Sequence, residues 1–405
     1  MTLAEVPLVV VLVGLVAYTV LAGADFGAGF WQLTPGRGER AQAVRAYARH
    51  AIAPVWEANH VWLILVLTMT WTCYPSAFAA IASTLAAPLT IAALGIVLRA
   101  VGYVVRGQTD TLRGRRPIEG LFAVSSIVVP FALGAAIGGI ASGRVPPGNA
   151  QGDMVTSWLN PTSIAIGAVA VATTAYISSV WLTADAVRDG ERELVDAFRT
   201  RALWSAVVTG AIAFVSLIVV RSDAERLWHG LTKWPGIAAV VVSALAGAAA
   251  LGLVAWRRFE PARVVSVVAV GAIIVGWALA QRPEILPHLT IAQAAASRAT
   301  LVATLIGLAV GSLILVPSLG ILFRMVLRGT FSAEPATHAA TPASRVSIVW
   351  DPGRRTALCV VGLVAGALVL VVGDAAWSIA IGAGLLLVAG AFGFVVVARS
   401  LASAD

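Results

Sequence analysis

Long apolar blocks alternate along the whole chain with short segments that carry most of the charged residues. An α-helix needs roughly 20 apolar residues to cross a hydrocarbon core of about 30 Å. Eleven blocks meet or approach this length, at about residues 4–31, 53–76, 79–105, 120–142, 161–184, 202–220, 235–256, 264–281, 300–323, 357–373 and 376–398. The eighth is short and the last two are nearly continuous, so we expect ten or eleven helices. The pattern predicts an all-α fold, a polytopic bundle of transmembrane helices.

The composition supports this class. Of the 405 residues, 59% are hydrophobic and 12% are charged, about half the charged fraction of a soluble domain. We divide the chain into a transmembrane body of about nine helices (1–328), a flexible linker rich in Ala, Thr, Ser and Pro (329–356), and a C-terminal helix pair (357–405). The N-terminus lacks the basic region of a signal peptide, so we expect the first block to stay as a helix.

Basic residues are distributed unevenly between the segments that connect the blocks. The side on which the first block ends holds 22 of the 28 Lys and Arg residues, and the opposite side holds Arg144, Arg221, Arg226, Lys233, Arg282 and Arg298. The positive-inside rule therefore predicts an outer N-terminus and a cytoplasmic C-terminus. These cytoplasmic arginines also explain the net charge of +8, so no nucleic acid partner is needed.

Ionisable residues also lie inside the apolar blocks, where a charge costs several kcal/mol unless it is paired or hydrated. Asp25 is near the end of the first block, and Arg99 is near the end of the third. Glu57 and His60, three residues apart, share one helix face in the first turns of the second block. At 1.5 Å per residue all of them reach a similar depth near the cytoplasmic surface. The spacing predicts a buried acid–base cluster at that depth.

Two interpretations of this cluster stay open. It can be a structural ion-pair network that holds three helices together. Alternatively it can be a proton relay or part of a quinone or cofactor environment, since burial raises the pKa of a carboxyl group towards neutrality, where an imidazole ordinarily titrates. His60 could ligate haem, although a lone helical histidine is more often hydrogen-bonded. No metal-ligand spacing such as CxxC or HxxxH occurs, so we expect no metal site in this chain.

Small and aromatic residues in the same blocks have a simpler interpretation. Gly23, Gly27 and Gly29 are expected to form one small-residue face on the first helix, which favours close helix packing. Trp56 and Trp62 are typical of packing positions or of the aromatic belt at a membrane interface.

Three segments carry a recognisable pattern. They read Gly23-Ala-Asp-Phe-Gly-Ala-Gly29, Ile52-Ala-Pro-Val-Trp-Glu-Ala-Asn-His-Val-Trp-Leu-Ile64 and Arg99-Ala-Val-Gly-Tyr-Val-Val-Arg106. In order and spacing they resemble subunit II of the cytochrome bd quinol oxidases, which shows G-F-D-x-G-x-G, P-x-W-[DE]-x-N-x-V-W-L and R-x-V-[GA]-[FY]-x-x-R on its first three helices. The residues that match are Asp25, Trp56, Glu57, Asn59, Trp62, Arg99 and Arg106. The resemblance covers roughly residues 10–110.

The resemblance implies a heterodimer with a haem-bearing subunit I in the bacterial cytoplasmic membrane. In this family subunit I carries haems b and d and the quinol site, where oxygen becomes water during aerobic respiratory electron transport. Subunit II alone is expected to bind no haem. It can hold a bound quinone and can contribute part of a proton path. This chain would then be a subunit of a quinol:oxygen oxidoreductase and would not be catalytic by itself.

The chain departs from the family pattern at several positions. The family usually has a further aspartate where Ala22 stands, a phenylalanine where Ala24 stands, and often an acid where Val104 stands. The missing acids weaken the proton-path interpretation and leave open a divergent paralogue with another partner. A hypothesis from a different class is a proton-coupled transporter that uses the same cluster. Transporters keep polar sites near the membrane midplane, whereas this cluster lies near one surface, which argues against transport.

Overall fold

In the computed structural model the chain divides into two compact units, Met1–Phe331 and Ser332–Asp405. The structure describes residues 2–34, 38–50, 53–106 and 112–327, together with the isolated helical positions 361, 365, 381, 385 and 388. The predicted linker (329–356) lies outside the described residues, as does nearly all of the predicted helix pair (357–405), so both stay predictions. The first unit contains all three segments that carry the family pattern.

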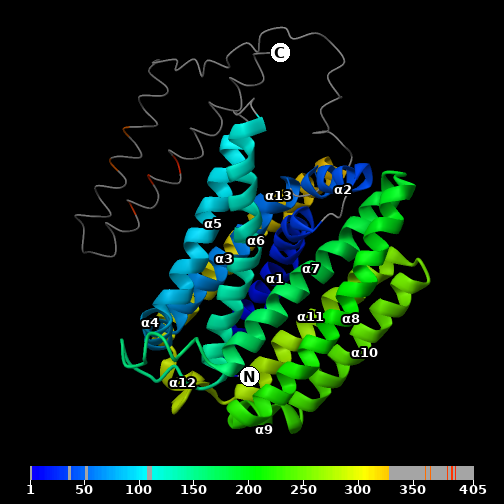
Figure 1. Ribbon diagram of the computed structural model, residues 1–405. Coiled ribbons are helices and arrows are strands. Elements are labelled where there is room, and N and C mark those ends of the chain that lie inside the picture. The colour runs from blue at the N-terminus through cyan, green and yellow to red at the C-terminus, as the bar shows by residue number, and fades with distance from the viewer. Residues whose placement is uncertain are drawn as a thin grey trace. The chain divides into compact units, whose positions relative to one another are not determined.

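The first unit is a bundle of long α-helices with short helices and a small antiparallel hairpin between them (Figure 1). Its elements are a 3₁₀ turn (Leu3–Glu5), α1 (Val6–Leu33), α2 (Glu39–His50), α3 (Ala53–Cys73), α4 (Pro75–Thr84), α5 (Ala86–Arg106), α6 (Leu112–Ala141), α7 (Pro161–Arg188), α8 (Arg192–Asp223), α9 (Glu225–Thr232), α10 (Gly236–Ala255), α11 (Phe259–Gln281), β1 (Glu284–Leu286), β2 (Leu289–Thr290), α12 (Ile291–Ala294) and α13 (Arg298–Leu327).

The long helices account for the apolar blocks of the body. Within the described residues, seven helices are long and apolar enough to cross a membrane, or up to eight if one bent pair counts as a single span. The second block falls on α3, of which Asn59–Cys73 is counted as a shorter apolar helix. Of the nine blocks of the body, the first and the fourth to ninth each coincide with one of these seven long helices. The prediction of an all-α, multi-pass membrane protein is confirmed.

The third block (79–105) is predicted as one helix, and this is wrong. Helix α4 ends at Thr84, α5 begins at Ala86, and the two axes are bent by 82°. Pro88 gives the physical reason, because a proline ring collides with the carbonyl of the residue four positions earlier in a continuous helix. That carbonyl belongs to Thr84, the last residue of α4. Hydropathy alone does not detect the break, since both halves are apolar.

The short elements are absent from the sequence-based prediction. Helix α2 packs against α1 and α8 through Ala41, Val44 and Ala48, which are buried. These apolar residues are small, and two exposed arginines lie beside them, Arg40 just before Ala41 and Arg45 just after Val44. Such a segment has the hydropathy of a cytoplasmic loop even though its apolar residues recur at helical spacing.

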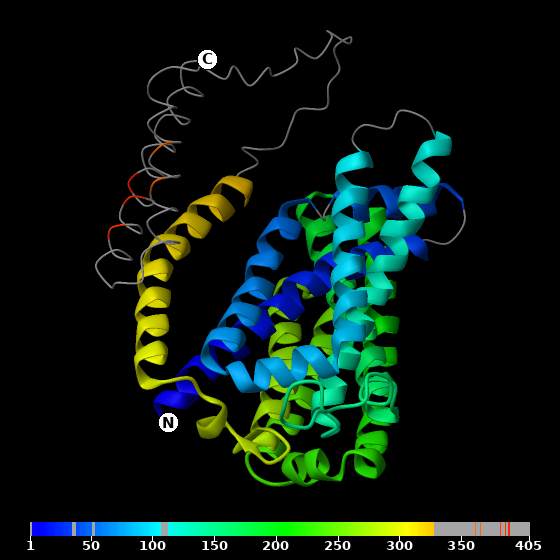
Figure 2. The same ribbon diagram turned by 90° about the vertical axis from the view of Figure 1, so that its left-hand side faces the viewer.

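Helix α1 is the central element of the first unit and packs against α3, α6 and α7. The largest cluster of buried side chains includes Trp31 of α1, Tyr176 of α7 and Phe198 of α8. Helix α13 lies at one edge of the bundle (Figure 2), and 6% of the residues in its most apolar 18-residue stretch are buried. The inner helices therefore pack closely on protein, whereas the outer helices present apolar side chains to their surroundings.

Polar contacts join the connecting segments at each end of the bundle. At the arginine-rich end, Tyr47 of α2 donates a hydrogen bond to Asp189 after α7 (2.6 Å). Burial and this hydrogen bond raise the pKa of Tyr47 above its usual value. At the opposite end, Arg144 donates two hydrogen bonds to Asp223 (3.0 and 2.7 Å). Segments that the charge pattern assigns to one side of the membrane therefore meet at one end of the bundle.

Candidate functional site

Asp25 lies near the C-terminal end of α1, and its side chain is fully buried. A carboxylate removed from water needs a positive partner and several hydrogen-bond donors. Helices α3, α5 and α6 surround this part of α1 and supply these groups. The residues that meet here are Asp25, Asn59, Arg99 and Ser126, and we refer to them as the Asp25–Arg99 centre.

Arg99 of α5 is the positive partner, and it is 1% exposed. Its Nη2 lies 2.5 Å from Oδ1 of Asp25, and its Nε lies 3.3 Å from Oδ2. The same Nη2 lies 2.9 Å from the backbone carbonyl oxygen of Asp25. The guanidinium thus binds the carboxylate with two nitrogens, the geometry in which an arginine–carboxylate pair is strongest.

Helix α6 completes the surroundings of the guanidinium. Nη1 of Arg99 donates to Oγ of Ser126 at 2.6 Å, and this hydroxyl donates in turn to the carbonyl of Phe122 at 2.8 Å. The guanidinium carbon lies 3.8 Å from the ring centroid of Phe122 and 4.8 Å from that of Phe26. Aromatic faces attract a desolvated cation, so the two rings further compensate the burial of the charge.

Asn59 of α3 brings in a third helix. Its Nδ2 donates to Oδ2 of Asp25 at 3.4 Å, and its side chain is completely buried. Its Oδ1 and the hydroxyl of Tyr18 on α1 are both buried without a hydrogen-bond partner among the described residues. The carboxylate of Asp25 on α1 thus accepts hydrogen bonds from Asn59 on α3 and from Arg99 on α5. The centre joins these three helices, and the contact of Arg99 with Ser126 adds α6.

The remaining members of the predicted acid–base cluster are His60 and Glu57, and Trp56 and Arg106 are two further residues of the family pattern. His60 follows Asn59 on α3 and is half-buried. The side chains of Glu57, Trp56 and Arg106 lie outside the described part of the structure. The structure thus brings Asp25 and Arg99 together, whereas the position of Glu57 relative to them stays a prediction.

Trp62 packs one turn along α3 from Asn59. It contacts the buried cluster that contains Tyr18, Ala22 and Phe26 of α1, together with residues of α5 and α6. Its role in the structure is packing beside the Asp25–Arg99 centre. Among the predicted site residues whose side chains the structure describes, Trp62 is the one that packs on this cluster.

The glycines of α1 explain how the helices approach so closely. A Cβ on Gly27 would lie 1.9 Å from the carbonyl oxygen of Thr174 on α7, and a Cβ on Gly23 would meet Ile177 of the same helix at 3.4 Å. A Cβ on Gly29 would instead lie 2.0 Å from Oγ of Ser126 on α6. The expectation that all three share one face is therefore wrong for Gly29, because two residues along a helix correspond to a rotation of about 200°.

Ser126 and Phe122 are the members of this neighbourhood that sequence reasoning missed. Both lie inside the fourth apolar block, where a serine carries no charge to draw attention to it. Two adjacent serines, Ser125 and Ser126, interrupt this apolar block, and this polar pair is the sequence signal that could have identified α6 as a contributor. Both serines are buried in the structure. Among the described residues, no group of three or more His, Cys, Asp and Glu side chains could hold a metal ion.

Comparison with known proteins identifies relatives over most of the chain. A family model for cytochrome bd terminal oxidase subunit II matches residues 3–326. Over 216 residues the chain is 22% identical to a Bacillus subtilis protein that carries the name of a cytochrome bd menaquinol oxidase subunit II; the match covers 53% of this chain and 61% of that protein. Over 126 residues it is 27% identical to cytochrome bd ubiquinol oxidase subunit 2 of the same organism, covering 31% and 36%.

The fold also has a solved counterpart. A chain in the structure of bd oxidase from Geobacillus thermodenitrificans superposes with a TM-score of 0.63 at 23% identity, and the match covers 81% of this chain and 99% of that one. The part matched by the family model, 3–326, contains all three motif segments and the Asp25–Arg99 centre. The chain belongs to the cytochrome bd terminal oxidase subunit II family.

Proposed function

We propose that this chain is the non-haem subunit II of a cytochrome bd-type quinol oxidase, in which two quinols reduce one O₂ to two molecules of water. The observation that carries the proposal is the composition of the Asp25–Arg99 centre. Asp25, Asn59 and Arg99 come from three separate motif segments, and they meet in one buried cluster of hydrogen bonds. Residues that define the family pattern in sequence therefore also form one unit in space.

The contacts of the centre favour a supporting role for this chain. The carboxylate of Asp25 is bound by two nitrogens of Arg99 and by Asn59, so the centre fixes the relative positions of α1, α3 and α5. The redox chemistry would belong to the partner, subunit I, which is expected to hold haems b and d and the quinol site. A bound quinone and a segment of a proton path near Glu57 and His60 are further expectations that the family membership supports.

The membrane orientation forms part of the proposal. The arginine-rich end of the bundle would face the cytoplasm, and residues 2–5 would face the outer side of a bacterial cytoplasmic membrane. The heterodimer with subunit I would form through apolar helix faces that the first unit leaves exposed, since transmembrane helices associate by close packing.

Purification from native membranes tests the proposal directly. A tag on this chain should recover a second, haem-bearing subunit together with quinol-dependent oxygen consumption. The separately expressed chain should show no Soret band. A colourless chain without a partner that catalyses proton-coupled uptake would overturn the proposal in favour of a transporter. Recovery with a partner that bears no haem would instead identify a divergent paralogue.

A further inference from the structure

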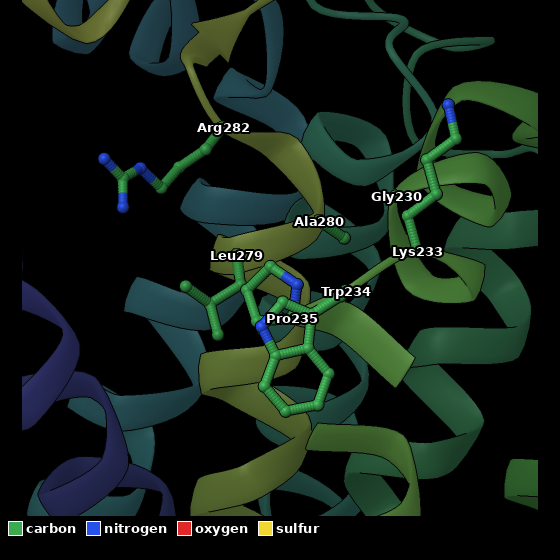
Figure 3. Close-up of a pocket in the computed structure, with 7 residues that line it drawn as sticks. All are labelled: Gly230, Lys233, Trp234, Pro235, Leu279, Ala280 and Arg282. Atoms are coloured by element: carbon green, nitrogen blue, oxygen red, sulfur yellow. The ribbon is translucent and has the colours of Figure 1, made fainter. Parts of the chain in front are cut away.

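A cavity of about 300 Å³ opens at the end of the bundle that holds residues 2–5, where α9, α10 and α11 meet. It is lined by Gly230, Lys233, Trp234, Pro235, Leu279, Ala280 and Arg282 (Figure 3). The indole of Trp234 lies beside Pro235 and Leu279, while the side chains of Lys233 and Arg282 extend away on opposite sides. The cavity thus combines an apolar floor with two cationic side chains at its rim.

The position of the cavity relative to the bilayer follows from α10. Trp234 precedes this helix and is 80% exposed, and Trp256 follows it and is 78% exposed. At 1.5 Å per residue the backbone positions of the two tryptophans are about 33 Å apart along the helix, close to the thickness of a hydrocarbon core. Exposed tryptophans at both ends of an apolar helix are typical of the two membrane interfaces. The cavity beside Trp234 therefore lies at the level of the lipid headgroups.

The outward faces of the neighbouring helices are apolar. Large exposed side chains on α10 include Val241 and Leu245, and those on the half of α11 that is nearer the cavity include Ile273 and Val275. In the most apolar 18-residue stretch of α10, 11% of the residues are buried. An acyl chain can lie along such a surface, and the lipid that it belongs to would place its headgroup at the cavity.

The cationic side chains at the cavity rim favour a negatively charged headgroup. Lys233 is the sole lysine of the sequence, and it forms no ion pair with an acid among the described residues. Arg282 binds Oε1 of Glu5 through Nη2 at 2.5 Å. Of the other acids in this region, Glu284 is paired with Arg226, whereas Glu225 hydrogen-bonds His229, a ring that carries a charge only when it is protonated. Among the described residues, Lys233 is therefore the cation of the cavity rim that no acid contacts directly.

We propose that this cavity binds the phosphate headgroup of an anionic phospholipid in the outer leaflet, with Lys233 as the main electrostatic contact, Arg282 as a second cation, and Trp234 and Leu279 against the glycerol and upper acyl chain. The site goes beyond the oxidase assignment, because it depends on the membrane position of α10 and not on redox chemistry. It would fix the outer ends of α10 and α11 to the bilayer.

Photo-crosslinking on the purified complex tests the site. Reconstituted complex is exposed to a photoactivatable phosphatidylglycerol or to the matched phosphatidylcholine, and the crosslinked peptides are mapped by mass spectrometry. Segments 230–236 and 279–282 should be labelled about fivefold more by the anionic lipid, the ratio expected for one basic residue near the surface. Lys233→Gln should abolish this preference. Arg298→Gln, which removes another exposed cation at the same end of the bundle, should leave it unchanged.

Three results would overturn the proposal. Equal labelling by the two lipids would mean an apolar surface without headgroup selection. Displacement of the lipid label by excess inorganic phosphate would mean a site for free phosphate. Labelling of a partner subunit in place of these segments would mean that protein covers the cavity. Oxygen consumption measured on the same preparations reports on the oxidase assignment separately.

Discussion

Arg99 and Asp25 form an ion pair in the interior of the bundle, with Nη2 and Oδ1 2.5 Å apart and both side chains excluded from solvent. An ion pair in this environment loses the hydration of both charges, so its stability depends on the hydrogen bonds that remain. Here Ser126, Asn59 and the backbone carbonyl of Asp25 supply them. The pair is therefore expected to specify helix positions more than to add net stability.

The first prediction separates these two effects. Arg99→Leu leaves the Asp25 carboxylate buried without a cation and should destabilise the complex by about 3–5 kcal/mol. The double variant Asp25→Leu with Arg99→Met should recover much of that loss, because no buried charge is left. The measurement is thermal unfolding of the detergent-solubilised complex. Arg258→Gln, at an exposed arginine that forms no ion pair among the described residues, serves as the control and should unfold like the unaltered protein.

The same pair shows how far the sequence could lead. Asp25 and Arg99 are identifiable because a charge in an apolar block is unusual, and helix rise places both at one depth. Ser126 is not identifiable in this way, because it carries no charge and the fourth block stays apolar overall despite it. The bend between Thr84 and Ala86 is likewise hidden in an apolar run, although Pro88 marks it once backbone geometry is considered.

The second prediction concerns the contact between α1 and α7. Gly27→Ala should impair assembly, because the added Cβ would meet the backbone carbonyl of Thr174 at 1.9 Å and backbone cannot rotate away. Overpacking of this kind costs typically about 1–3 kcal/mol and sometimes more. Gly23→Ala is the matched control on the same face, since its nearest contact is the flexible end of Ile177 at 3.4 Å. The amount of assembled complex in membranes distinguishes them, and equal yields would contradict the packing argument.

The third prediction concerns orientation and follows from the 22 basic residues on one side. The chain has two cysteines, Cys73 and Cys359, and both are replaced by serine in the background for this test. In that background, Asn149→Cys in the outer connection between α6 and α7 should react with a membrane-impermeant maleimide in intact cells. Thr341→Cys in the predicted cytoplasmic linker should react only after the cells are permeabilised. The opposite pattern of labelling would place the arginine-rich end outside.

The fourth prediction concerns Glu57, which the family pattern places on α3 two residues before Asn59. Glu57→Gln keeps the side-chain volume and a hydrogen-bonding end but removes the titratable proton. It should leave the complex assembled and lower its quinol-oxidase turnover. Glu57→Leu also removes the hydrogen bonds, and a buried partner left unpaired costs about 1–3 kcal/mol, or more if that partner is charged. The leucine variant should therefore lose assembly as well as turnover.

The pH dependence of turnover then decides between the two interpretations of the polar cluster. If Glu57 relays protons, the loss in Glu57→Gln should deepen under conditions in which proton delivery limits the rate. If Glu57 belongs to a structural network with the Asp25–Arg99 centre, the glutamine variant should behave like the unaltered complex at every pH, since glutamine can still accept and donate hydrogen bonds. Full turnover of Glu57→Gln across the pH range would exclude the relay, and the destabilising effect of Glu57→Leu would then measure the network alone.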